Sequence, residues 1–142
     1  MASKVYTVGY GNIKLPALQA FLEEHNAILF DIRYSPRSRN PVWNKGNLEA
    51  TLGDHYRHCR DLGNANYQGG PTELVNPDAG IEAILRSTKP VVLMCVCPSF
   101  HDCHRSEVAE LLKERGITTE ELTPRTLASS TPTQSQLWSG LL

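Results

Sequence analysis

Three cysteines stand close together in the second half of the chain, and two of them are placed for chemistry. Cys95, Cys97 and Cys103 lie within nine residues, and His104 and Arg105 directly follow the last of them. A cysteine reacts as its thiolate, which a neighbouring cation or a helix N-terminus stabilises. Cys95 and Cys103 are therefore candidate nucleophiles, and His104 is their candidate acid–base partner. A buried, unreactive Cys95 is the alternative.

The residues around these cysteines predict a strand, a loop and a helix. The apolar run Val91–Met94 predicts a buried strand that ends at Cys95. A helix is expected to follow, with Asp102 as its N-cap and Gly116 just beyond its end. In α/β proteins, anionic ligands bind where a strand passes into a helix N-terminus.

A second pair of chemically active residues, Asp31 and Arg33, follows another apolar run, Ala27–Phe30. Asp31 is a candidate general base or an orienting group, and a guanidinium such as Arg33 can bind phosphate with two parallel hydrogen bonds. A structural ion pair that fixes the loop is the alternative, and it is compatible with either role.

A run of cations continues from this pair without an acidic residue between its members. Arg37, Arg39 and Lys45 follow Arg33, and the aromatic residues Tyr34 and Trp43 lie among them. Clustered cations suit phosphates, and aromatic side chains stack on exposed bases. A solvated loop with a buried Trp43 is the alternative. The residues predicted to bind substrate are Gly9, Tyr10, Asn12, Arg33, Arg37, Arg39 and Arg105.

The cysteine-rich segment also holds potential metal ligands. Sulfur and imidazole ligands suit zinc. Their spacing differs from that of the common paired C-x2-C zinc sites, so the sequence predicts neither a metal nor another cofactor. The potential ligands are Cys95, Cys97, His101, Cys103 and His104.

Apolar strand-like runs alternate with helix-like segments along most of the chain. This alternation predicts a single α/β domain of three layers, with a mostly parallel sheet flanked by helices, over residues 1–122. The loops that follow the strands should meet at one edge of that sheet, here called the rim. Residues 123–142 are rich in Ser, Thr, Pro and Gln and predict a flexible or loosely packed tail.

Bulk properties exclude some classes of protein. The net charge of the 142 residues is −1, so a basic site for nucleic acid must be local. No apolar run is long enough to span a bilayer, and Met1–Lys4 leads directly into a predicted strand. A cytoplasmic protein with reduced thiols is therefore expected, in preference to a disulfide scaffold.

The tail contains a short segment, Gln134–Trp138, that resembles the peptide by which many bacterial proteins dock onto the DNA sliding clamp. Gln134 would make directed hydrogen bonds, while Leu137 and Trp138 would enter an apolar groove. Packing of these apolar residues onto the domain itself, or onto a second copy, is the alternative.

Several motifs together resemble one family, the domain of unknown function 488 proteins. The resemblance implies a compact α/β domain without an assigned activity. Cys97 stands where family members often carry an acidic residue. The matching motifs are Thr7–Asn12, Asp31–Ser38, Trp43–Lys45, Leu62–Gly63, Gly69–Gly70, Leu93–Cys95 and Cys103–Ser106.

A weaker similarity is to the rhodanese-like sulfurtransferases. The segment Leu29–Arg33 resembles their Asp-x-Arg strand, and the order of strand, cysteine loop and helix over residues 91–112 resembles their sulfur-carrying loop. The loop length differs from the one usual in that family, so the similarity is an analogy and does not assign this chain to the family.

The functional hypothesis is an enzyme of nucleic-acid metabolism, dependent on cysteine or aspartate, whose rim accepts a phosphate or a nucleotide. The alternatives are a non-catalytic module that binds nucleic acid or protein, and a thiol-based sulfurtransferase or sulfur carrier. We expect Asp31, Arg33, Cys95 and Arg105 to share one pocket. The Arg105 guanidinium should face it, bound to an anion or to a carboxylate such as Asp31.

Overall fold

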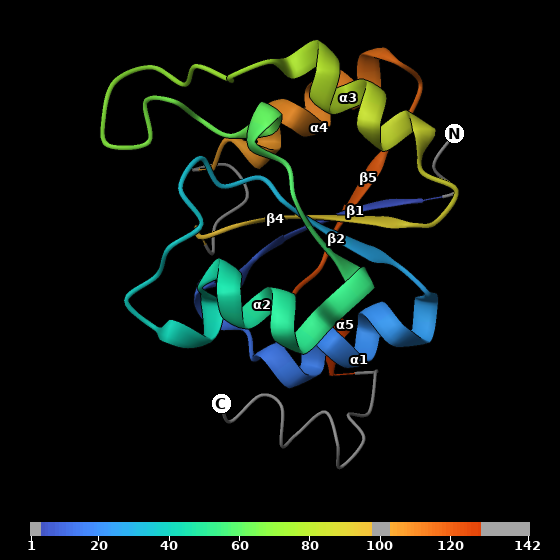
Figure 1. Ribbon diagram of the computed structural model, residues 1–142. Coiled ribbons are helices and arrows are strands. Elements are labelled where there is room, and N and C mark those ends of the chain that lie inside the picture. Colours follow the sequence, from blue (N-terminus) through green and yellow to red (C-terminus); the bar gives the residue numbers. More distant parts are fainter. Residues whose placement is uncertain (1–3, 98–102, 129–142) are drawn as a thin grey trace.

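The protein is built on one five-stranded parallel sheet, seen in a computed structural model that describes residues 4–97 and 103–128 (Figure 1). The strand order is β3-β2-β4-β1-β5, and every neighbouring pair runs parallel. The three-layer α/β prediction is therefore confirmed. The strands are β1 Val5–Gly9, β2 Ile28–Asp31, β3 Tyr56–His58, β4 Val91–Cys95 and β5 Thr119–Glu121.

Helices cover both faces of the sheet (Figure 1). One layer contains α1 Leu15–His25, α2 Lys45–Leu52 and α5 Pro124–Leu127, and the other contains α3 Pro77–Arg86 and α4 Arg105–Glu114. Short 3-10 helices in the described residues complete the connections: Tyr10–Asn12, Pro41–Trp43, Gly53–His55 and Arg60–Leu62.

The position of β4 at the centre of the sheet explains why every residue of this strand is apolar. Every residue of β4 is at most 1% exposed. Val92 and Met94 pack into the core beneath α1 and α2, whereas Leu93 and Cys95 pack into the core beneath α3 and α4. Successive side chains of a strand point to opposite faces, so a strand covered on both faces needs apolar residues at each position.

The ends of β1, β2 and β4 meet at the rim, as the sequence predicted. Gly9 lies opposite Cys95, and Asp31 lies opposite Met94. Gly9 is needed there for close packing, because a Cβ atom at this position would overlap the backbone carbonyl of Cys97. The rim can therefore bring the loops after β1 and β4 into direct contact.

Two predicted boundaries differ from the structure. Helix α4 begins at Arg105 with His104 as its N-cap, later than the Asp102 cap that the sequence indicates. Asp102 itself lies outside the described residues. Leu127 of α5 is 1% exposed and belongs to the core, so the packed domain extends beyond residue 122. The Thr123 side chain caps α5 by accepting a hydrogen bond from the Thr126 N–H.

The segment Gln134–Trp138 also lies outside the described residues, so clamp docking stays a prediction. Within residues 4–97 and 103–128, no helix combines the length and the apolar character that crossing a membrane requires.

Two glycines test the packing of the helical layers. A Cβ atom at Gly80 in α3 would overlap the side chain of Leu62, whereas no atom lies within 4 Å of a Cβ atom at Gly46 in α2. We expect Gly80→Ala to lower the free energy of unfolding by about 1–3 kcal/mol through overpacking. Gly46→Ala should raise it by up to about 1 kcal/mol, because alanine favours helix. Urea unfolding of both variants measures this, and equal effects would contradict the packing described.

Candidate functional site

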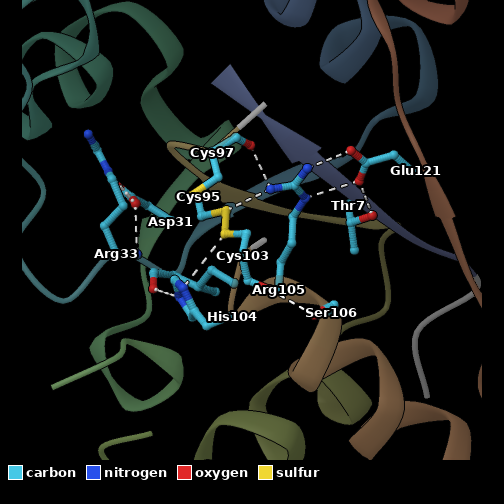
Figure 2. Close-up of a disulfide and its surroundings, with 11 residues drawn as sticks. Thr7, Asp31, Arg33, Cys95, Cys97, Cys103, His104, Arg105, Ser106 and Glu121 are labelled. Carbon is cyan, nitrogen blue, oxygen red and sulfur yellow. Dashed lines mark hydrogen bonds and ion pairs between the residues drawn. A yellow bond between two sulfur atoms is a disulfide. The ribbon is translucent and has the colours of Figure 1, made fainter. Parts of the chain in front are cut away.

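Two of the predicted nucleophiles are held together at the rim. Cys95 ends β4, Cys103 lies just before α4, and a disulfide joins them (Figure 2). Both are at most 6% exposed. The expectation of fully reduced thiols is corrected for this pair. Cys97 and Cys59 are free, and burial raises the pKa of the Cys59 thiol, which makes it a poor nucleophile.

His104 faces this sulfur pair in a defined orientation (Figure 2). Its Nδ1 atom lies 3.7 Å from the Cys103 sulfur, and its Nε2 atom lies 2.8 Å from the carbonyl oxygen of Ile32. A carbonyl only accepts, so Nε2 carries the proton and Nδ1 presents its lone pair to the sulfur. Burial lowers the pKa of His104, although the bond to Ile32 opposes this shift. The imidazole is thus a neutral acceptor beside a sulfur atom.

Arg105 lies behind the sulfur pair and is fully buried (Figure 2). Its Nε and Nη2 atoms donate to the Glu121 carboxylate at 3.1 and 2.7 Å. Its Nη1 atom donates to the Cys95 sulfur at 2.9 Å and to the Cys97 carbonyl oxygen at 2.7 Å. Arg105 was predicted to face the pocket, bound to an anion or to a carboxylate such as Asp31. It does bind a carboxylate, but the partner is Glu121 of β5, and Arg105 is not among the residues that line the pocket.

The Asp31–Arg33 pair is also buried, with its charges fully matched. Asp31 accepts from Arg33 Nε at 2.8 Å, from Arg33 Nη2 at 2.6 Å and from the Tyr56 hydroxyl at 2.6 Å. Burial disfavours the charged form of Arg33, but the contacts with Asp31 outweigh it, and the Arg33 pKa is raised. Burial also raises the pKa of Tyr56, so Tyr56 remains a donor.

These contacts decide between the roles considered for Asp31. Both of its carboxylate oxygens accept hydrogen bonds, and the residue has no exposed surface. A general base must reach the proton that it removes. The geometry therefore fits an orienting role, in which Asp31 holds Arg33 at the pocket wall.

A pocket of about 500 Å³ opens at the rim, beside the sulfur pair. Six predicted site residues line it: Tyr10, Arg33, Arg37, Cys95, Cys103 and His104. Five others do not: Gly9, Asn12, Asp31, Arg39 and Arg105. Gly9 serves close packing, Asp31 and Arg105 lie buried in ion pairs, and Asn12 and Arg39 are exposed.

The loop after β3 contributes pocket residues that the sequence reasoning missed. The Asn64 Oδ1 atom accepts the backbone N–H groups of Asn66 and Glu73, both at 2.9 Å, which folds the loop back on itself. Tyr67 then stacks on Tyr34, with ring centroids 5.6 Å apart and planes at 27°. An aromatic residue between turn-forming Asn and Gly residues was the available signal for an exposed stacking position.

A second pocket of about 730 Å³ adjoins the first and is basic. The two pockets share Tyr34, Ser35 and Arg37, and the second adds Lys45 and Arg60. The Arg60 guanidinium lies 4.4 Å from the Tyr34 ring centroid and donates to its hydroxyl at 2.6 Å. None of the described residues that line this second pocket is acidic. The pair of pockets thus combines cations, an aromatic stack and a sulfur–imidazole centre.

The sulfur–imidazole centre is also the place where a metal could bind. Cys95, Cys103 and His104 each offer one ligand atom, and these atoms lie within 4.8 Å of one another. Cys97 is not in this group, although it lines the first pocket.

The buried ion pair gives a test of how the site is held. Asp31→Asn removes the counter-charge of a guanidinium that is 6% exposed. We expect the free energy of unfolding to fall by about 3–5 kcal/mol, because a buried charge is left uncompensated. The matched control is Glu120→Gln, which removes an exposed pair with Lys4 at 3.5 Å and should cost less than about 1 kcal/mol. Urea unfolding measures both, and similar losses would contradict the structural role of Asp31.

Comparison with known proteins gives one match. The family model of Domain of unknown function DUF488 matches residues 17–70, which contain Asp31, Arg33, Arg37 and the Tyr34–Tyr67 pair. No curated protein and no solved structure matches the chain. The resemblance to rhodanese-like sulfurtransferases is not confirmed. The match over residues 17–70 supports the resemblance to the DUF488 family that the motifs predicted.

Proposed function

We propose that this protein is an enzyme that acts on a phosphate-bearing substrate, a nucleotide or a nucleic-acid end, bound across the two adjoining pockets. One observation carries the proposal. The pockets share Tyr34, Ser35 and Arg37, so a ligand held by the cations of one pocket reaches the sulfur–imidazole centre of the other.

The basic pocket supplies the phosphate contacts. Arg37, Lys45 and Arg60 are exposed there, so their charges are available to a ligand. A guanidinium binds phosphate oxygens in pairs, and several cations around one site raise the affinity further. Because the whole chain has a net charge of −1, the attraction for an anion is local to this pocket.

The Tyr34–Tyr67 pair supplies the contact for a base. Tyr67 is 55% exposed, which is unusual for a large ring and leaves surface on which a base can stack. Tyr34 is held by Tyr67 and Arg60, so the platform is ordered before the ligand arrives. Stacking tolerates any base, which fits a class of substrates rather than one nucleotide.

The sulfur–imidazole centre supplies the reactive groups. In the reduced form, the Cys103 thiol can transfer its proton to His104 Nδ1, since the lone pair of that nitrogen faces the sulfur. Arg33 lines the same pocket and stays charged, so it can stabilise negative charge that develops on a bound phosphate.

A second candidate function is sulfur transfer, favoured by the contact between Arg105 and the Cys95 sulfur at 2.9 Å. A cation beside the sulfur stabilises an anionic persulfide. Attack by the Cys103 thiol on the inner sulfur of a Cys95 persulfide would form the Cys95–Cys103 disulfide and release hydrogen sulfide. Mass spectrometry of the reduced protein after treatment with thiosulfate would show one added sulfur atom on Cys95, and no addition would exclude this candidate.

Binding measurements test the proposed phosphate site. We expect Arg37→Ala and Lys45→Ala each to weaken binding of a fluorescent adenine nucleotide or a short single-stranded oligonucleotide by roughly tenfold or more, since a charge-assisted contact is lost. Arg39→Ala is the matched control, because Arg39 has the same charge and lies in the same loop but lines neither pocket. Added salt should weaken wild-type binding.

The stacking contact is tested in the same assay. Tyr67→Phe should bind as the wild type does, and Tyr67→Ala should lose about 1–3 kcal/mol of binding free energy. Equal losses in the Arg37 and Arg39 variants would contradict the proposal. So would a wild-type protein that binds neither ligand at millimolar concentration.

A further inference from the structure

We infer that the reduced protein binds a zinc ion through the Cys95 and Cys103 sulfur atoms and His104 Nδ1. Within residues 4–97 and 103–128, these are the three side chains whose ligand atoms lie within 4.8 Å of one another. Two thiolates and one imidazole are ligands that zinc prefers. The inference goes beyond the proposed function, because it concerns a metal-bound state of the reduced protein that is distinct from the free thiol in which Cys103 would act as the nucleophile.

The separations suit a tetrahedral zinc ion. Bonds of about 2.3 Å to sulfur and about 2.0 Å to nitrogen place a sulfur and a nitrogen ligand roughly 3.6 Å apart. The separation between Cys103 Sγ and His104 Nδ1 is 3.7 Å. Reduction removes the bond between the two sulfur atoms, which then separate toward van der Waals contact. Two sulfur ligands of one zinc ion lie about 3.8 Å apart, close to that contact distance.

His104 is already oriented as a metal ligand. A ligating histidine usually donates its other ring N–H to a carbonyl or a carboxylate, which fixes the tautomer and the ring. Here Nε2 donates to the Ile32 carbonyl oxygen at 2.8 Å, and Ile32 is fully buried. Nδ1 is thereby fixed as the atom that faces the sulfur pair, with no rearrangement needed for it to bind a metal.

The surroundings of Cys95 support a thiolate ligand. Arg105 Nη1 donates to the Cys95 sulfur at 2.9 Å, an outer contact of the kind that stabilises metal-bound thiolates. The Arg105 charge is balanced by Glu121, with Nη2 and Oε2 at 2.7 Å. Two thiolates balance the charge of one zinc ion, so the metal site and its surroundings are together neutral. That balance favours metal binding at a largely buried position.

The described residues supply three of the four ligands that a tetrahedral zinc ion takes. All three residues line the pocket of about 500 Å³, so the remaining position faces it. Catalytic zinc sites keep such an open position, whereas structural sites close it with a fourth side chain. An oxygen atom of water or of a phosphate in this pocket, which Arg33 also lines, is the expected further ligand.

The Cys95–Cys103 disulfide must be reduced before these residues can bind zinc. A dithiol or a phosphine supplies two electrons, and with two protons the disulfide becomes two thiols. Zinc binding then releases one proton from each thiol, while His104 Nδ1 binds through a lone pair that carries no proton. The disulfide and the metal site are therefore mutually exclusive states of the same residues.

The test uses the full chain and the metals alone. Protein reduced with a phosphine, which is then removed, should bind one equivalent of zinc in competition with a chromophoric chelator. Cobalt in place of zinc should give the intense visible bands of a tetrahedral site and a thiolate-to-metal charge-transfer band. Cys103→Ser and His104→Ala should each weaken zinc binding more than about 100-fold. Loss of a residue that only contacts a ligand costs up to about 100-fold, and loss of the ligand itself should cost more.

Two controls keep the outcome clear. Cys97→Ser should bind zinc as the wild type does, because Cys97 lies outside the ligand group. Wild-type protein oxidised to the disulfide should bind none, a control that needs no substitution and is independent of variant folding. Equal zinc binding by the oxidised and reduced forms, loss of zinc in Cys97→Ser, or cobalt spectra without the thiolate band would overturn the inference. Nucleotide binding is measured in a separate assay. A negative zinc result would therefore overturn this inference without contradicting the proposed phosphate site.

Discussion

The buried guanidinium of Arg105 is the interaction on which the rim depends. Among the described residues, its donors reach the Glu121 carboxylate at the end of β5, the Cys95 sulfur at the end of β4, and the Cys97 carbonyl that follows β4. Arginine suits this place because its five donors form a fixed planar fork that keeps its charge. The edge strand β5, the central strand β4 and the chain just after β4 are thus tied to the start of α4 by one side chain.

Asp31 and Arg33 perform the same task on the other side of β4, so the rim contains two buried arginines that hold structure. The exposed cations, Arg37 and Lys45, come from the loop and the first residue of α2 that follow. This division separates two uses of one residue type. Arg105 is wholly enclosed and only positions its neighbours, whereas Arg33 is held by Asp31 and also lines the pocket. Arg37 is exposed, so its whole guanidinium is available to a ligand.

Much of the fold could be predicted, because the spacing of apolar residues along the chain indicates which side chains are buried. The unbroken apolar run of β4, with α/β alternation around it, was enough for a parallel sheet and for the meeting of Asp31 and Cys95 at one edge. The partner of Arg105 could not be predicted, because Glu121 lies in a strand of three residues that the sequence marks only weakly. Tyr67 was missed for a related reason, since side-chain hydrogen bonds of Asn64 shape its loop and leave no periodic signal.

The small size of the edge strands has a consequence for association between molecules. β3 and β5 each contain three residues, and they form the two margins of the sheet. An unpaired strand edge invites pairing with another chain, and shortness is one way in which proteins suppress it. The longer, almost wholly apolar strand β4 lies in the middle, shielded by a neighbour on each side. The order of strands therefore keeps an apolar segment of the kind that promotes aggregation paired on both sides while the protein stays folded.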